Sequence, residues 1–158
     1  MIPEGMDNVE HEGELGIVIK KPSYRIENPK EHILGYTIVN DITARELEKE
    51  MVQWSASKSF PTFCPVGPCI ETGLNPGSIG IRCRVNGILK QDGNTRDMIY
   101  NAEECVKFAS RFMVLEKGDL ISTGTSSTGK LFPGDEIEVE IEGIGRLKNH
   151  IKGKTKVK

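Results

Sequence analysis

Glu12 and Glu14 stand two residues apart at the start of an apolar run, rich in β-branched residues, that ends at Ile19. In a β-strand alternate side chains share a face, so the two glutamates would point the same way. Two like charges side by side on one face repel each other unless a positive group lies between them. Mg²⁺ and Mn²⁺ bind carboxylate oxygens and could supply that charge. The alternative is a solvent-exposed polar face at the start of a strand, which is common for an isolated pair of this kind.

Two later residues could join the same site. Asp41 directly follows the expected strand 33–40, where it could either bind a ligand or cap the next helix. Thr43 and Glu46 form the Ser/Thr-x-x-Glu pattern of a capping box, which predicts that Asp41 is free for another task. Lys58 lies in a proline-rich segment, although a lone loop lysine is usually just solvated.

A segment rich in glycine and hydroxyl side chains, residues 121–129, follows another short apolar stretch. Its backbone N–H and side-chain O–H groups could bind a carboxylate or a phosphate. The segment is not a nucleotide-binding P-loop, because Leu131 follows Lys130 where that motif requires serine or threonine.

Composition indicates an ordinary globular protein, and we expect a single domain over residues 1–158. The formal net charge of -2 gives no electrostatic argument for nucleic-acid binding. No apolar run approaches the roughly 18 residues that a membrane span needs, and the chain does not start like a secretory signal. We therefore expect a cytoplasmic protein whose cysteines are free thiols, because their spacing does not match a zinc site.

The hydrophobic pattern predicts mostly strands and two short helices. We expect the fold class α+β, β-rich, with a mixed or antiparallel-rich sheet rolled on itself and the helices on one side. Asn86-Gly87 is the strongest hairpin signal. Residues 1–10 and 54–68 are predicted to be mainly loops. The expected strands are 14–20, 33–40, 78–85, 88–91, 120–123, 136–142 and 146–151, and the expected helices are 44–52 and 103–112.

An ordered set of short motifs carries a family resemblance. The motifs are His11-Glu12-Gly13-Glu14-Leu15, Asn40-Asp41-Ile42-Thr43-Ala44-Arg45, Lys58-Ser59-Phe60 with Cys64-Pro65, Thr123-Gly124-Thr125, Pro133-Gly134-Asp135 and Glu142-Gly143-Ile144-Gly145. Each motif alone is weak, but the set, which runs from about residue 9 to residue 151, is specific. In this order the motifs resemble the C-terminal catalytic domain of the fumarylacetoacetate hydrolase family, which implies that family's mixed β-roll.

The resemblance also implies a set of site residues. Glu12, Glu14 and Asp41 would be the carboxylate ligands of one Mg²⁺ or Mn²⁺, and Lys58 would be the active-site lysine. The implied substrate-binding residues are Arg45, Thr62, Thr123, Gly124 and Thr125. Ser126 stands where the family usually has proline, so the local backbone of that loop could differ.

Members of this family act on 2-oxo acids or their enols, such as acylpyruvates, oxaloacetate and hydroxymuconate-type diacids. The resemblance therefore implies a metal-dependent hydrolase, decarboxylase or isomerase that works as a homodimer. In such an enzyme the metal acts as a Lewis acid and stabilises the enolate formed when a C–C bond breaks or a proton moves. The alternative is a catalytically weak, metal-binding dimeric module.

Hydrolytic members of the family commonly activate water with a His–Glu pair on a lid that precedes the first metal ligand. Only eleven residues precede Glu12 here, and His11 is the only histidine among them. Strand alternation would point His11 away from Glu12, which favours a structural role for it. We therefore expect this lid to be missing, which favours decarboxylation or isomerisation over hydrolysis.

Overall fold

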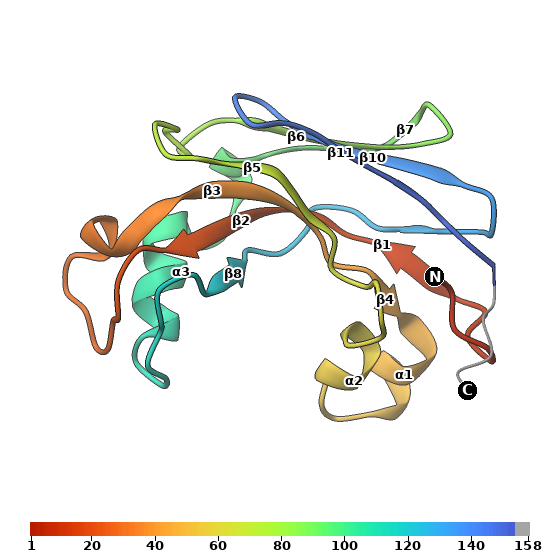
Figure 1. The fold of residues 1–158 in the computed structure, drawn as a ribbon, viewed down its shortest axis with the longest axis horizontal. Helices are drawn as coiled ribbons and strands as arrows, with labels where there is room; N and C mark the ends of the chain where they lie inside the picture. Colours follow the sequence, from red (N-terminus) through yellow and green to blue (C-terminus); the bar gives the residue numbers. More distant parts are fainter. Residues whose placement is uncertain (154–158) are drawn as a thin grey trace.

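The computed structural model describes residues 1–153, and its strands form three antiparallel sheets (Figure 1). The first sheet has the order β5-β3-β2-β8, the second β11-β10-β6-β7 and the third, a small one, β4-β1-β9. The strands are β1 (Val9–His11), β2 (Gly13–Ile19), β3 (Ile33–Asn40), β4 (Thr43–Ala44), β5 (Val66–Glu71), β6 (Gly80–Val85), β7 (Ile88–Asn94), β8 (Leu120–Ser122), β9 (Gly129–Lys130), β10 (Glu136–Ile141) and β11 (Gly145–His150).

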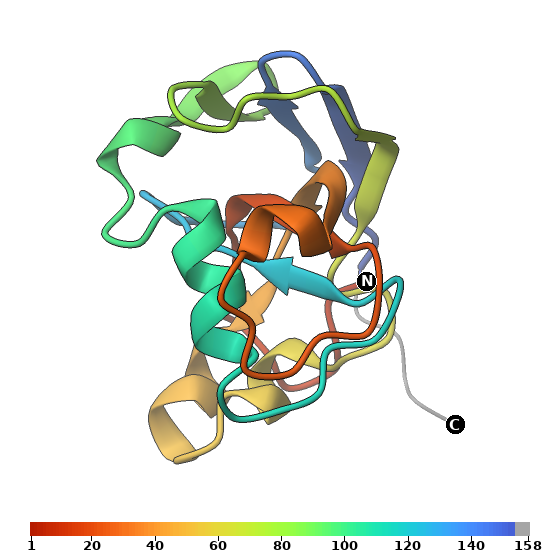
Figure 2. The same ribbon diagram turned by 90° about the vertical axis from the view of Figure 1, so that its left-hand side faces the viewer.

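The two four-stranded sheets pack on each other, with the helices below the sheet that contains β2 and β3 (Figures 1 and 2). The α-helices are α1 (Arg45–Glu50), α2 (Ser55–Lys58) and α3 (Ala102–Ala109), and the 3-10 helices are η1 (Pro29–His32) and η2 (Thr95–Asp97). Every residue of β2 is buried, because both of its faces are covered. The prediction of a β-rich α+β fold with short helices on one side is confirmed.

The core lies where alternate side chains of the two large sheets meet. Leu15 and Ile38 are fully buried on one sheet, and Val139 is fully buried on the other. In β10 the buried residues alternate with partly exposed glutamates, as the sequence pattern predicts. This packing matters for function because it fixes the position of β2 and β3, which contain or adjoin the three acidic residues.

Several predicted elements are confirmed and several are wrong. The β6–β7 hairpin turns at Asn86 and Gly87, which both adopt positive φ, 52° and 77°. The predicted loop 54–68 instead contains α2 and the start of β5, and the predicted entry loop contains β1. Strand β7 continues to Asn94, past its predicted end at Gln91. These short elements form through pairing with distant segments, which a local pattern does not report.

The predicted capping box at Thr43 and Glu46 is also wrong. Thr43 lies in β4, paired with Glu10 of β1, so the residue before α1 is Ala44, which provides no side-chain cap. The Glu46 carboxylate instead accepts hydrogen bonds from the backbone N–H groups of residues 7 and 8. The chain's true capping box joins Asn101 and Glu104 at the start of α3.

Within residues 1–153, none of the helices has the length and apolar character needed to cross a bilayer. The single domain over residues 1–158 stays a prediction, and residues 154–158 lie outside the described part of the chain.

Candidate metal centre

Three carboxylates that are distant in sequence meet at one point of the fold. Glu12, Glu14 and Asp41 each offer one oxygen, and these oxygens lie within 4.8 Å of one another. Glu12 occupies the break between β1 and β2, Glu14 belongs to β2 and Asp41 directly follows β3. Because Gly13 pairs with Asn40 in the β2–β3 ladder, the register brings the end of β3 beside the two glutamates.

Hydrogen bonds to the main chain hold these residues in register. The backbone N–H of Asp41 donates to the carbonyl oxygen of Glu12 at 2.8 Å. The backbone N–H of Glu12 in turn donates to Oδ1 of Asn40 at 3.1 Å. Gln91 clamps the residue between the glutamates: its Nε2 donates to the carbonyl of Gly13 at 2.7 Å, and its Oε1 accepts from the Gly13 N–H at 3.2 Å. The carboxylates are therefore positioned before any ion binds.

Lys58, the last residue of α2, lies directly against this cluster. Its Nζ donates to Oε2 of Glu12 at 2.7 Å, to Oδ2 of Asp41 at 2.6 Å and to Oγ1 of Thr43 at 2.9 Å. Burial alone would lower the pKa of Lys58, but its hydrogen bonds to Asp41 and Glu12 outweigh that effect and raise the pKa. Lys58 is therefore a positive charge held against Glu12 and Asp41.

Arg45, the first residue of α1, is committed to carboxylates through all three of its guanidinium nitrogens. Nε donates to Glu10 at 2.8 Å, Nη1 donates to Glu48 at 2.7 Å, and Nη2 donates to Oε1 of Glu12. Its side chain is only 14% exposed. Arg45 therefore orients Glu12, and its predicted contact with substrate stays a prediction.

Glu14 has the most buried carboxylate of the three, with only 2% of the residue exposed. It accepts hydrogen bonds from the Ser122 hydroxyl and from the backbone N–H of Gly124, the latter at 2.7 Å. Burial raises the pKa of Glu14; those two hydrogen bonds oppose the shift, and the nearby charges of Asp41 and Glu12 add to it. A bound cation would stabilise the ionised form of this carboxylate.

The donor set fits a hard divalent ion. Three carboxylates offer only oxygen ligands, which suits Mg²⁺ or Mn²⁺ better than a soft transition metal. Because three protein ligands leave positions open in an octahedral sphere, a small oxygen ligand could share the ion.

The loop that contains Thr123, Gly124 and Thr125 lies beside the glutamates. Its Thr123 hydroxyl donates to the carbonyl of Leu15 at 2.9 Å, and its Thr125 hydroxyl donates to the carbonyl of Ser127 at 2.8 Å. The Thr123 bond and the Gly124 N–H bond to Glu14 fasten the loop to β2, whereas the Thr125 bond lies within the loop. The two bonds to β2 position Glu14, and the predicted binding of substrate by the loop stays a prediction.

Two other predicted residues lie apart from these contacts. The Thr62 hydroxyl accepts a hydrogen bond from the amino group of Met1, and Thr62 lines a separate cavity of ≈ 600 Å³. His11 is fully buried, and an added Cβ on Gly129 would lie 2.7 Å from its Nε2. This close packing fits the structural role expected for His11.

Sequence reasoning missed Gln91 and Asn40, which position the site. Asn40 precedes a candidate ligand, and this adjacency is the only local signal for it. Gln91 comes from β7, in the other sheet, and no spacing in the sequence links it to Gly13. The glycine at position 13 is consistent with this contact, because a Cβ there would lie 2.8 Å from Oε1 of Gln91 and would displace that side chain.

Comparison with known proteins supports the fold and shows the family. The family model of the fumarylacetoacetate hydrolase C-terminal domain matches residues 1–152. An oxaloacetate tautomerase of Bacillus subtilis is 42% identical over 161 residues, covering 94% of this chain and 54% of that protein. The crystal structure of a 5-carboxymethyl-2-hydroxymuconate delta-isomerase from Mycobacterium smegmatis superposes with a TM-score of 0.95 at 40% identity, over 98% of this chain and 63% of that one.

A more distant relative was solved with ligands bound. A fumarylpyruvate hydrolase from Pseudomonas aeruginosa, in complex with Mn²⁺ and pyruvate, has a TM-score of 0.89 at 28% identity, over 96% of this chain and 69% of that chain. The fold of this chain thus matches that of solved enzymes whose names include an isomerase and a hydrolase. The chain belongs to the fumarylacetoacetate hydrolase family, as its C-terminal domain. It spans 54% and 63% of the lengths of the first two relatives.

Proposed function

We propose that this chain is the catalytic domain of a divalent-metal-dependent enzyme that acts on a 2-oxo acid or its enol. The observation that carries the proposal is the convergence of Glu12, Glu14 and Asp41 within 4.8 Å beside the charged Lys58. The relative bound to Mn²⁺ and pyruvate supports the choice of ion and of substrate class.

The residues of the site would have separate roles. The three carboxylates would hold the ion, and the chemistry that a bound Mg²⁺ or Mn²⁺ supplies is Lewis-acid polarisation of the 2-oxo group. Lys58 places a positive charge beside the same carboxylate oxygens, where it would stabilise negative charge developing on the C2 oxygen. Arg45 keeps Glu12 oriented, and Gly124 and Ser122 keep Glu14 oriented, so little reorganisation is needed during reaction.

Among the family's reactions we propose proton transfer, that is keto–enol tautomerisation or isomerisation. Proton transfer suits this site, because the ion and Lys58 would stabilise the enolate and the proton would be exchanged with water, with no activated nucleophilic water needed. Relatives of similar identity include a tautomerase at 42%, an isomerase at 40% and a fumarylacetoacetate hydrolase at 40%, so sequence identity does not choose among these reactions. Homodimer formation and a cytoplasmic location stay predictions.

The test combines metal binding with turnover. The purified chain is titrated with Mn²⁺ by calorimetry, and enol–keto conversion of oxaloacetate and acylpyruvates is followed by ultraviolet absorbance. We expect Mn²⁺-dependent conversion that is lost in Glu14→Gln and Lys58→Met and retained in Glu50→Gln, a control at the exposed end of α1. Metal binding without conversion of any substrate would instead support a metal-binding module, and absence of metal binding would refute the site.

A further inference from the structure

We propose that a cavity beside the 123–126 loop receives the distal part of the substrate and selects an uncharged tail over a second carboxylate, with Asp97 as the specificity-determining residue. This inference rests on the proposed function, since it assumes that the 2-oxo acid end of the substrate lies at the metal centre. It concerns the other end of the molecule, which the three carboxylates and Lys58 do not contact.

The cavity adjoins the metal centre through a shared wall. Its volume is ≈ 400 Å³, and residues 123–126 line one side of it. The backbone N–H of Gly124, in that wall, donates to Glu14. Ser126, also in the wall, lies 3.5 Å from Nε2 of Gln91, the residue that clamps Gly13. The loop therefore contacts the metal site on one side and lines the cavity on the other.

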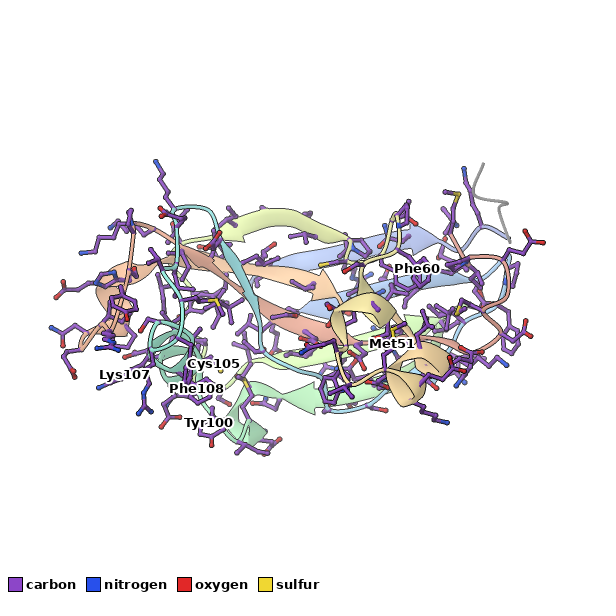
Figure 3. The ribbon with its side chains drawn as sticks, turned by 90° about the horizontal axis from the view of Figure 1, so that it is seen from below. Met51, Phe60, Tyr100, Cys105, Lys107 and Phe108 are labelled. Atoms are coloured by element: carbon purple, nitrogen blue, oxygen red, sulfur yellow. The ribbon has the colours of Figure 1, made fainter. Side chains whose placement is uncertain are left out.

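The opposite wall comes from the segment between β7 and α3. Figure 3, seen from below, shows Tyr100 and Cys105 at the α3 end of this face, and Met51 and Phe60 at the end that carries α1 and α2. Ile99 is 92% exposed and Tyr100 is 63% exposed. Apolar side chains that line a cavity while remaining this exposed are available to contact a ligand.

The charge that lines the cavity is negative. Asp97 is its only charged residue, and none of the residues that line it is lysine or arginine. Its remaining polar groups are neutral, and they include the hydroxyl groups of Ser126 and Tyr100, which can donate to a carbonyl oxygen. Within residues 1–153, no lysine or arginine forms an ion pair with Asp97.

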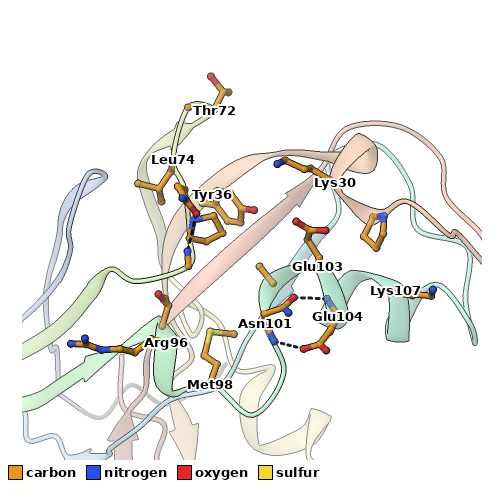
Figure 4. A pocket seen from close by; sticks show the side chains of 17 residues that line it. Lys30, Tyr36, Thr72, Leu74, Arg96, Met98, Asn101, Glu103, Glu104 and Lys107 are labelled. Carbon is orange, nitrogen blue, oxygen red and sulfur yellow. Dashed lines mark hydrogen bonds between the residues drawn. The ribbon is translucent and has the colours of Figure 1, made fainter.

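The neighbouring Arg96 could have neutralised this charge, but it faces a different cavity. Arg96 lines a larger cavity of ≈ 910 Å³, together with Lys30 and Lys107 (Figure 4). In that view Arg96 extends away from both lysines. None of the three carboxylates, and no residue of the 123–126 loop, lines this larger cavity. The cations of this region therefore lie outside the cavity that adjoins the metal centre.

A substrate tail that ends in a carboxylate would thus be placed beside Asp97 without a counter-charge. Both groups would be partly exposed, so solvent would weaken their repulsion, and we expect a roughly tenfold discrimination rather than complete exclusion. A ketone, ester or amide at the same position would meet hydroxyl donors and apolar walls instead. The chemical class that fits is an acylpyruvate-type 2,4-dioxo acid with an uncharged tail.

The experiment compares two compounds that differ only in this charge. Succinylpyruvate ends in a carboxylate, and its distal carboxamide has the same length and shape without the charge. Binding of each to the Mn²⁺-loaded chain is measured by calorimetry, and kcat/KM is measured alongside. We expect roughly tenfold tighter binding of the carboxamide. Asp97→Asn should reduce this preference to about twofold or threefold, and Asp97→Lys should reverse it.

Asp92→Lys is the matched control, because it makes the same charge change on β7 outside the cavity and disrupts only an exposed ion pair with Arg82. It should leave the preference unchanged. Melting temperature and Mn²⁺ affinity, measured for every variant, separate a folding defect from a change in specificity. Equal binding of the two compounds, or an unchanged ratio in Asp97→Lys, would overturn the inference alone. Failure of both compounds to bind in a Mn²⁺-dependent manner would overturn the proposed function as well.

Discussion

Replacement of Lys58 by methionine should tighten metal binding while abolishing turnover. The side chain keeps its length but loses the ammonium group that now donates to Glu12 at 2.7 Å and to Asp41 at 2.6 Å. Those two residues are also two of the three candidate metal ligands. A divalent ion must therefore bind beside a fixed positive charge, which opposes it electrostatically.

The size of the effect follows from this geometry. A cation bound to these oxygens at about 2.1 Å would lie about 4–5 Å from Nζ. Charges of +2 and +1 at about 5 Å repel by about 1.7 kcal/mol in a medium as polar as water, and by more in a less polar one. Because the Lys58 side chain is only 23% exposed, the repulsion should be at least this large. The dissociation constant for Mn²⁺ should therefore fall by at least about tenfold in Lys58→Met.

The metal-free Lys58→Met variant, in contrast, should be less stable than the metal-free wild type. Without Lys58, two partly buried carboxylates lose their counter-charge; the loss is about 3–5 kcal/mol for a fully buried pair and about 2 kcal/mol here after allowance for exposure. In a protein of this size that corresponds to a melting temperature lower by about 4–8 °C. Saturating Mn²⁺ should recover most of the difference, because the ion supplies the missing positive charge.

Calorimetric Mn²⁺ titrations and melting curves with and without the ion measure both effects. Lys49→Met, which removes an exposed lysine from α1, serves as the control and should change neither quantity. The reasoning would be refuted if Lys58→Met weakened Mn²⁺ binding as much as Asp41→Asn does. That result would mean that Lys58 is needed to hold the ligands in place rather than to act on the substrate.

Four further outcomes are expected. Glu14→Gln should weaken Mn²⁺ binding by more than tenfold in calorimetry, because a neutral amide replaces a charged ligand. In the wild type, Mn²⁺ affinity should fall as pH is lowered through the raised pKa of Glu14, because a protonated carboxyl must release its proton to bind; titrations in buffers of different ionisation enthalpy count that proton. Gly129→Ala should cost about 1–3 kcal/mol in denaturant unfolding, since its Cβ would lie 2.7 Å from His11, whereas exposed Gly77→Ala should cost less. Asn101→Ala should cost about 0.5–2 kcal/mol by removing the cap of α3.

The sequence contained enough to place the three carboxylates together. Strand periodicity puts Glu12 and Glu14 on one face, and Asp41 follows a β-branched run that ends at the same edge. These are local regularities of backbone geometry, so they survive in the fold even though β1 and β2 are separate strands rather than one. The ordered motifs supplied the rest, because they tied distant segments to one family.

What the sequence could not provide was the arrangement of the groups around those carboxylates. The local pattern predicted that Thr43 caps a helix. In the structure β4 pairs with β1, so Thr43 lies in a strand, where its hydroxyl accepts a hydrogen bond from Lys58. Gln91 contributes through contact between two sheets, which no local pattern encodes. Arg45 was expected to bind substrate, and its three bonds to carboxylates appear only once α1 is placed against β1.

The charges of the site give the strongest physical reason to expect a cation beside Glu14. Arg45 is shared among Glu10, Glu12 and Glu48, and Lys58 is shared between Glu12 and Asp41. Glu14 accepts hydrogen bonds only from the neutral donors of Ser122 and Gly124, and within residues 1–153 no lysine or arginine pairs with it. A buried carboxylate without a counter-charge is costly, since it must either hold a proton or bind a cation. Its oxygens meet those of Glu12 and Asp41, so one divalent ion would relieve the repulsion among all three carboxylates at once.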